Sequence, residues 1–184
     1  GIAFYVDALN GGILILIALV AVINLIATRQ DAAGFFENRL GPFYALYLLF
    51  VTGLMGIVIT GDLFNLYVLL EIASLTGYAL IGMGGARSRI SSLHYVFMGT
   101  IGASLYLLGV GYLYMATGSL NMMDLAGLLP GLENMFLVKV SFLLCLVGLF
   151  IKMAFFPLHA WLPNAYSHAA SPCASLIAPL TTKV

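Results

Sequence analysis

The sequence predicts an all-α protein, a polytopic bundle of transmembrane helices, on two observations. First, 62% of the 184 residues are hydrophobic and only 8% are charged, whereas soluble domains average about 45–50% apolar and about 25% charged residues. Second, apolar segments of about 20 residues, the length that crosses a bilayer as a helix, recur with short polar breaks between them. A chain of this composition has too few polar residues for a water-soluble surface, so its first partner is expected to be the lipid bilayer.

About six spans are expected, within a single transmembrane domain over residues 1–184. The expected spans are residues 8–27, 43–60, 63–83, 92–115, 135–162 and 171 onward, and a short amphipathic segment at 122–129 suits the membrane interface. The fifth span is too long for one straight crossing, since about 28 residues make roughly 42 Å of helix. It is expected to break near Pro157, because proline lacks the backbone donor and clashes with the preceding turn. The chain begins without Met and stops inside an apolar segment, so both ends are expected to be cuts through a longer polypeptide.

Alternation of the spans places two arginine-bearing loops on one side of the membrane and acidic loops on the other. The arginines are Arg29, Arg39, Arg87 and Arg89, and the acidic residues of the opposite loops are Asp62, Asp124 and Glu133. Cytoplasmic loops of membrane proteins carry the excess of Lys and Arg. The arginine loops are therefore expected to be cytoplasmic.

Two charged residues lie deep within the predicted spans. Glu71 is about 12 Å into the third span at 1.5 Å per residue, and Lys152 lies roughly 20 Å beyond Lys139, an expected interfacial anchor. A charge near the bilayer centre costs at least about 2.5 kcal/mol, so it normally faces a partner or a wet cavity. We therefore predict a proton-translocating switch, in which Lys152 stays protonated beside Glu71 and releases its proton when Glu71 is drawn elsewhere. The alternatives are a packing carboxyl satisfied by Ser74 and a purely structural ion pair.

Four further residues are candidates for the same path. His159 lies seven residues after Lys152, so the two share a face if the helix resumes after the break, and histidine titrates near neutral pH. Lys183 lies deep in the last span. His168, before the sixth span, and Asp62, at the start of the third, are accessory candidates. The alternatives are a hydrogen-bonded structural role for both histidines and helix capping for Asp62.

Other function classes find no support in the residues. The formal net charge is 0, which leaves no basic field for nucleic acid. Cys145 and Cys173 lack CxxC or His/Cys spacing, so neither a disulfide nor a metal site is expected. No flavin, iron–sulfur or nicotinamide motif is present, so no cofactor and no catalytic chemistry are expected of this chain.

Three strings surround the buried charges. They are GDLFNLYVLLEIASLTGYALIG around Glu71, GLFIKMAFFPLHAWLPNAYSHAAS around Lys152 and His159, and SLIAPLTTKV before and at Lys183. They resemble the antiporter-like membrane subunits shared by respiratory complex I, membrane-bound hydrogenases and Mrp-type multisubunit cation/proton antiporters. The resemblance covers the whole chain and implies helices three to eight of a fourteen-helix subunit, with residues 43–184 approximating the first inverted-repeat half. It also implies a Glu71–Lys152 switch that Lys183 continues along a hydrophilic axis.

Departures from the complex I pattern favour the D-type membrane component of Mrp-type antiporters. Leu70, Ala154 and Tyr166 stand where many complex I members carry Trp, Pro and His, whereas GDLFNL and the Lys-x-Ala pattern look closer to the D-type component. The leading hypothesis is a proton-translocating subunit of a monovalent cation/proton antiporter in a prokaryotic plasma membrane, with other membrane subunits as partners and Na+ or K+ as the exchanged cation. The alternatives are a proton-pumping subunit of a redox complex, such as an NADH dehydrogenase or a membrane-bound hydrogenase, and a non-transporting membrane scaffold.

Overall fold

The computed structural model describes residues 3–132 and 135–182, and this part of the chain is helical apart from its connections. The helices are α1 (Ala8–Ala27), α2 (Arg29–Phe35), α3 (Leu40–Ile59), α4 (Leu63–Gly82), α5 (Ala86–Thr117), α6 (Met122–Leu128), the 3-10 helix η1 (Leu129–Gly131), α7 (Phe136–Lys152), α8 (Leu162–His168) and α9 (Ser171–Leu180). The predicted all-α class is confirmed.

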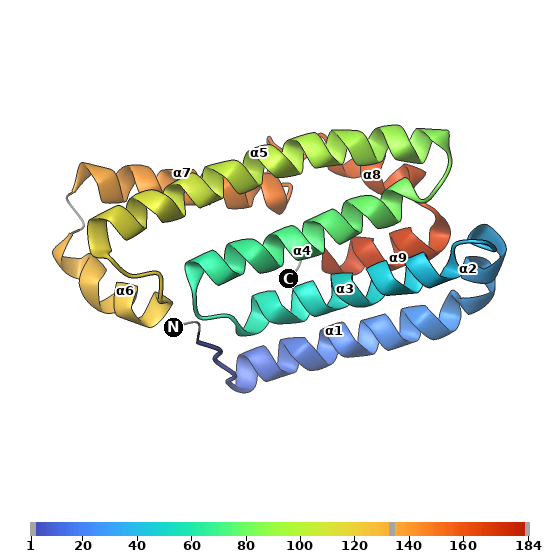
Figure 1. The fold of residues 1–184 in the computed structure, drawn as a ribbon, viewed down its shortest axis with the longest axis horizontal. Coiled ribbons are helices and arrows are strands. Elements are labelled where there is room, and N and C mark those ends of the chain that lie inside the picture. The colour runs from blue at the N-terminus through green and yellow to red at the C-terminus, as the bar shows by residue number, and fades with distance from the viewer. Residues whose placement is uncertain (1–2, 133–134, 183–184) are drawn as a thin grey trace.

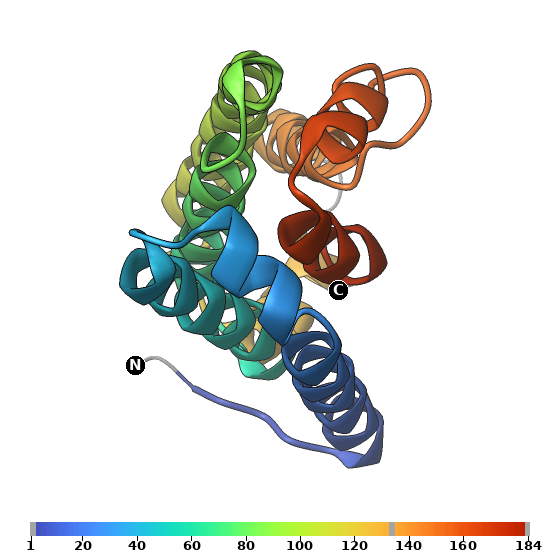
Figure 2. The same ribbon diagram turned by 90° about the vertical axis from the view of Figure 1, so that its right-hand side faces the viewer.

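The long helices form an elongated bundle in which they run side by side (Figure 1). α5 packs along α7, α4 packs against both α3 and α5, and α1 packs against α3. Seen from one end, α9 lies between α1 and α8 (Figure 2). α2, α8 and the α4–α5 connection lie at one end of the bundle, and α6 lies at the other.

Among the described residues, four helices are long and apolar enough to cross a membrane, namely α1, α3, α4 and α5. The first three match the predicted spans to within a few residues, because apolar length fixes them. α5 is longer than its predicted span, at 32 residues. Its polar first turns remain helical because Ser88 and Ser92 donate hydrogen bonds to α4, to the carbonyls of Ile81 and Tyr78 respectively.

The fifth predicted span is divided into two helices, as the proline indicated. α7 ends at Lys152 and α8 begins at Leu162, with residues 153–161 forming turns between them. The chain leaves the helix before Pro157, at Ala154, whose φ of 53° lies in the left-handed region. His159 therefore lies within the turns, and it does not share a helical face with Lys152.

Aspartates begin two of the spanning helices. The Asp7 carboxylate accepts a hydrogen bond from the Asn10 amide, and the Asp62 carboxylate accepts one from the Asn65 amide, both at 2.8 Å. Each satisfies a backbone donor that the first helical turn leaves free. The Asp62 cap fixes where α4 begins, and so fixes the depth of Glu71 along it.

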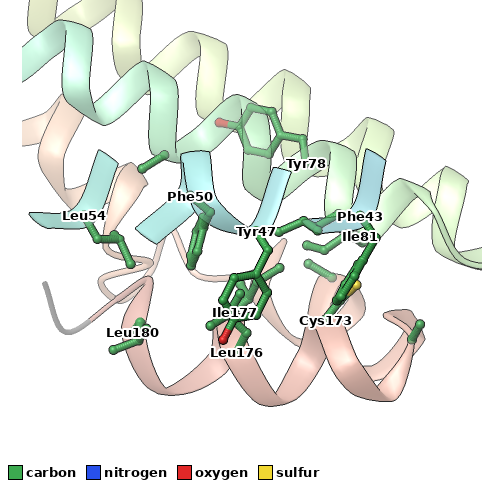
Figure 3. Packing of buried hydrophobic residues seen from close by; sticks show 14 of the residues in the cluster. Phe43, Tyr47, Phe50, Leu54, Tyr78, Ile81, Cys173, Leu176, Ile177 and Leu180 are labelled. Atoms are coloured by element: carbon green, nitrogen blue, oxygen red, sulfur yellow. The ribbon is translucent and has the colours of Figure 1, made fainter. Parts of the chain in front are cut away.

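A buried cluster seats α9 against α3 and α4 (Figure 3). Its members include Phe43, Tyr47, Phe50 and Leu54 of α3, Tyr78 and Ile81 of α4, and Cys173, Leu176, Ile177 and Leu180 of α9. This packing holds the short α9 beside the middle of the α3–α4 pair.

Glycines let α5 and α7 approach until their backbones nearly touch. A methyl group on Gly109 would lie 2.8 Å from the Ser141 carbonyl oxygen, and one on Gly148 would lie 2.6 Å from the Gly102 carbonyl oxygen. The Ser141 hydroxyl donates to the Gly109 carbonyl at 2.5 Å. Small residues thus bring the two helices together, as is common at helix interfaces in membranes, and this packing fixes the axis along which Lys152 is placed.

Candidate functional site

Glu71 and Lys152 meet inside the bundle. The Lys152 ammonium lies 2.7 Å from the Glu71 carboxylate. The Lys152 side chain is 10% exposed and the Glu71 side chain is 24% exposed. They are 81 residues apart in sequence and come from α4 and from the last residue of α7. Charge-assisted hydrogen bonds of this length are roughly twice as strong as neutral ones.

Ser74 is the second partner of Lys152. The ammonium donates to the Ser74 hydroxyl oxygen at 2.8 Å, and Ser74 lies one turn after Glu71 on the same face of α4. The sequence suggested Ser74 as a partner for Glu71, whereas in the structure it binds the lysine. Two oxygens of α4 therefore hold one cation of α7.

The end of α7 is a favourable place for this cation. The last carbonyls of a helix carry a partial negative charge, which stabilises a cation by about 0.3–1 kcal/mol and by more where the site is partly buried. Lys152 is the terminal residue of α7, and the turns that follow leave the backbone irregular at this depth. Irregular backbone within a membrane occurs where it is buried in protein or lines a wet cavity.

A small internal cavity of about 50 Å³ adjoins Lys152 and Ser74. Ser74, Tyr95, Lys152 and Thr181 contribute to its wall, and the rest of the wall is apolar surface of α3 and α4. The Thr181 hydroxyl is buried and has no hydrogen-bond partner of normal geometry among the described residues. A water molecule needs roughly 10–15 Å³ and two to four polar partners. The cavity therefore has both the room and the polar groups to hold water between α7 and α9.

The other predicted residues lie apart from the pair. His159 is exposed in the turns, where its ring lies 5.5 Å from that of Phe156. His168 ends α8, and its Nδ1 lies 2.9 Å from the Ser91 hydroxyl and 3.0 Å from the Asn164 carbonyl oxygen. Asp62 is the cap of α4. Lys183 lies outside the described residues.

Three polar residues near the site were not predicted from the sequence. Tyr78 lies four residues after Ser74 on α4, Tyr95 is buried on α5, and Thr181 follows α9. A signal existed for Tyr78, because Glu71, Ser74 and Tyr78 recur at the spacing of one helix face. Tyr95 and Thr181 reach the cavity only through the packing of α5 and α9.

The family model described as "NADH:quinone oxidoreductase/Mrp antiporter, TM" matches residues 60–184. This range contains Glu71, Lys152 and the residues of the cavity named above.

Several curated relatives match the whole chain, and two of them represent the two branches of the family. The chain is 50% identical over 184 residues to the N component of the NADH-quinone oxidoreductase of Desulforudis audaxviator (strain MP104C). It is 35% identical over 185 residues to the D component of the Na(+)/H(+) antiporter of Alkalihalophilus pseudofirmus. In both cases the match covers 100% of this chain and 37% of the relative, so the chain spans little more than a third of their length.

A solved structure supports the same fold. The Mrp complex from Dietzia sp. DQ12-45-1b matches with a TM-score of 0.81 and 26% identity, over 100% of this chain and 34% of the matched one. The predicted architecture, a fragment of a larger antiporter-like subunit, is confirmed.

Proposed function

Since the chain belongs to the NADH:quinone oxidoreductase/Mrp antiporter transmembrane family, we propose that it translocates protons as part of a membrane subunit in a multisubunit complex. The observation that carries the proposal is the 2.7 Å contact of Lys152 with Glu71 at the end of a broken helix. The active unit is the full-length subunit, in which residues 43–184 approximate one inverted-repeat half.

The pair works as a charge switch. While Glu71 is close, its carboxylate and the Ser74 hydroxyl hold the lysine as an ammonium. When Glu71 is drawn toward another cation or is protonated, the buried ammonium loses its counter-charge and becomes costly. Lys152 then gives one proton to water in the adjoining cavity, and it is reprotonated before the pair closes again.

The cavity supports one direction for the proposed transfer. It lies between Lys152 and Thr181, so water held there leads from α7 toward the end of α9, where the chain continues to Lys183. We propose that Lys183 receives the proton along this axis. His159, in the turns after Lys152, is proposed to belong to the same path, and His168, at the end of α8, is proposed as an accessory group.

The test uses neutral variants in the full-length subunit, assembled with its partners and reconstituted in vesicles. E71Q and K152M are each expected to lower pH-gradient-driven proton transport at least about tenfold, because a group that must accept and release the proton is missing. E37Q and K139M are the matched controls, since both parent residues are exposed, and they are expected to transport normally.

A double variant separates the switch from a structural ion pair. Removing one partner leaves an uncompensated buried charge, which destabilises a protein by about 3–5 kcal/mol. E71Q/K152M removes both charges, so it is expected to restore assembly without restoring transport. If the double variant restores both, the pair is only structural and the scaffold hypothesis holds.

The complex that contains this subunit is proposed to be a monovalent cation/proton antiporter that exchanges Na+ or K+. The support is the GDLFNL string, Ala154 two residues after Lys152, and the match to the D component of an antiporter over the whole chain. Addition of Na+ or K+ is then expected to collapse a preformed pH gradient across vesicles that hold the complex.

One observation favours a second candidate. The relative at 50% identity is the N component of an NADH-quinone oxidoreductase, a closer match than the antiporter protein. In a redox complex, electron transfer in other subunits would drive the same switch. Purification of the full-length subunit with its native partners distinguishes the two, because hydrophilic iron–sulfur subunits accompany it only in the redox complex.

We further propose that the arginine-bearing end of the bundle faces the cytoplasm of a prokaryotic cell. α2 and the α4–α5 connection, which neighbour these arginines in sequence, lie at the same end of the bundle, and α6 with Asp124 lies at the other (Figure 1). The positive-inside rule then assigns the first of these ends to the cytoplasm.

A further inference from the structure

The Tyr78 hydroxyl is a buried polar group without an evident role. Tyr78 is 4% exposed, and its hydroxyl oxygen has no hydrogen-bond partner of normal geometry among the described residues. A buried tyrosine hydroxyl usually finds a partner, and leaving one unpaired costs about 1–3 kcal/mol. The position of this hydroxyl therefore calls for a physical reason.

The hydroxyl is directed along α4 toward Ser74. Tyr78 follows Ser74 by four residues, which places the two side chains on one face of the helix, and long side chains lean back toward the N-terminus of their helix. Figure 3 shows the hydroxyl pointing toward the Leu54 end of the cluster. Leu54 is level with Ser74, because the preceding Gly53 lies against the backbone of Ala73.

Ser74 has a hydrogen to give. Its oxygen accepts from the Lys152 ammonium, which leaves its own O–H free to donate, and the Tyr78 hydroxyl is a neighbour with which the Ser74 side chain interacts. The Tyr78 oxygen, one turn away on the same face, is an unfilled acceptor. A donated Ser74 hydrogen would leave the Ser74 lone pair directed at Lys152.

The surroundings fix the Tyr78 ring. A methyl group on Gly99 of α5 would collide with the Tyr78 hydroxyl oxygen, so only glycine leaves room for it. The Tyr78 ring meets the Tyr95 ring edge-on at 4.3 Å, and Tyr95 stacks on Trp161 at 4.1 Å. The Trp161 indole donates to the carbonyl of Ile151, the residue before Lys152, at 3.2 Å. An aromatic chain thus joins Tyr78 to the backbone at the end of α7.

We propose that Tyr78 is a positioning residue for the proton transfer, whose hydroxyl takes the Ser74 hydrogen bond and so directs the Ser74 oxygen at the Lys152 ammonium. The inference rests on the proposed function of the Glu71–Lys152 pair and adds a third member to the α4 side of the site. When Lys152 gives up its proton, the Ser74 O–H can turn and donate to the neutral lysine nitrogen. The Tyr78 O–H can then donate to the Ser74 oxygen, so neither hydroxyl hydrogen is left unpaired.

Infrared spectroscopy of the full-length subunit in its assembled complex tests the link. Ring-labelled tyrosine marks the C–O stretch of every tyrosine in the complex, including the 10 of this chain. The Tyr78 band is the one that Y78F removes. S74A and K152M are each expected to shift this band, because the hydroxyl loses its partner or the partner reorients. The matched control is the Tyr47 band, assigned with Y47F, since the Tyr47 hydroxyl donates to the Ala21 carbonyl at 2.6 Å and is not expected to respond.

Transport measurements complete the test. Y78F keeps the ring and its packing, so it is expected to assemble normally and to transport about two- to tenfold more slowly, the effect of one net hydrogen bond, whereas Y47F transports normally. G99A keeps the hydroxyl but displaces it, so it is expected to shift the band and slow transport, whereas G111A, which opens on free space, changes neither.

The outcomes separate this inference from the proposed function. A Tyr78 band that neither S74A nor K152M moves overturns the inference, and so does full transport in Y78F. Normal transport in K152M overturns the switch itself, and the band then reports only whether the hydrogen bond exists.

Discussion

At the residue scale, the backbone after Lys152 decides where the ammonium is held. α7 ends at Lys152, and Ala154 turns the chain with a φ of 53°. A left-handed conformation costs an alanine roughly 1–2 kcal/mol, because its Cβ approaches the next carbonyl oxygen. The turn therefore places Lys152 at a helix end at a measurable cost in stability.

Substitution of Ala154 tests this conformation. A154V is expected to lower the free energy of unfolding by about 1 kcal/mol or more, because a β-branched residue is a strong outlier at positive φ. A154G is expected to stay within about 1 kcal/mol of the parent, since relief of the turn offsets the entropy of glycine in the unfolded chain. Thermal unfolding of the purified full-length subunit measures both. A160V in the same turns is the control, and an equal loss in A160V and A154V would contradict the argument.

The members of the site differ in how far sequence could predict them. Glu71 and Lys152 could be paired in advance because a charge deep in an apolar span demands a partner. Ser74 was expected beside Glu71, but which residue it binds depends on how α7 meets α4. Tyr78 escaped because an aromatic residue in a membrane helix is most often simple packing, and only the structure shows its hydroxyl buried without a partner of normal geometry among the described residues.

At the scale of elements, α5 and α7 pack together more extensively than any other two helices of the described residues. Helices in lipid gain little from the hydrophobic effect, so they associate through tight packing of small residues and through hydrogen bonds. Gly102, Gly109 and Gly148 supply the first, and the bond from Ser141 to Gly109 supplies the second. The position of α7, and with it that of Lys152, therefore depends on these three glycines.

G148A is expected to disturb this pair. Its methyl group would lie 2.6 Å from the Gly102 carbonyl oxygen and 2.8 Å from the Tyr106 amide nitrogen, and such overpacking costs about 1–3 kcal/mol. Thermal unfolding of the full-length subunit should show the loss. G111A, whose methyl group meets nothing within 4 Å, should unfold at the parent temperature or above, because alanine favours helix over glycine. A G148A protein as stable as G111A would show that the helices are not in backbone contact.

Element boundaries were predictable where a single physical signal sets them. Apolar length set α1, α3 and α4, and a carboxylate cap marked the starts of α1 and α4. The short helices α2 and α8 were not anticipated, because segments of 7 residues are too short to be stable alone and depend on tertiary contacts. Pro157 indicated a break, but the place where α7 stops is set by Ala154.

At the scale of the whole molecule, the two ends of the bundle differ in charge. α5 begins with Arg87 and Arg89 at the end that also holds α2, whereas α6 with Asp124 lies at the opposite end (Figure 1). Alternation of the spans predicted this separation, and the structure places these helices accordingly. Which end faces the cytoplasm follows from the membrane and not from the fold, so it calls for its own measurement.

Cysteine labelling in intact cells supplies that measurement. Gly85 and Gly127 lie at opposite ends, and a side chain at either meets nothing within 4 Å, so G85C and G127C make a matched pair in the full-length subunit. A membrane-impermeant maleimide is expected to label G127C in intact cells and G85C only after permeabilisation, because the positive-inside rule predicts that the arginine end faces the cytoplasm. The parent, whose Cys145 and Cys173 are half-buried and buried, gives the background. The reverse pattern would place the arginine end outside, and it would also reverse the side from which protons enter the proposed path through Lys152.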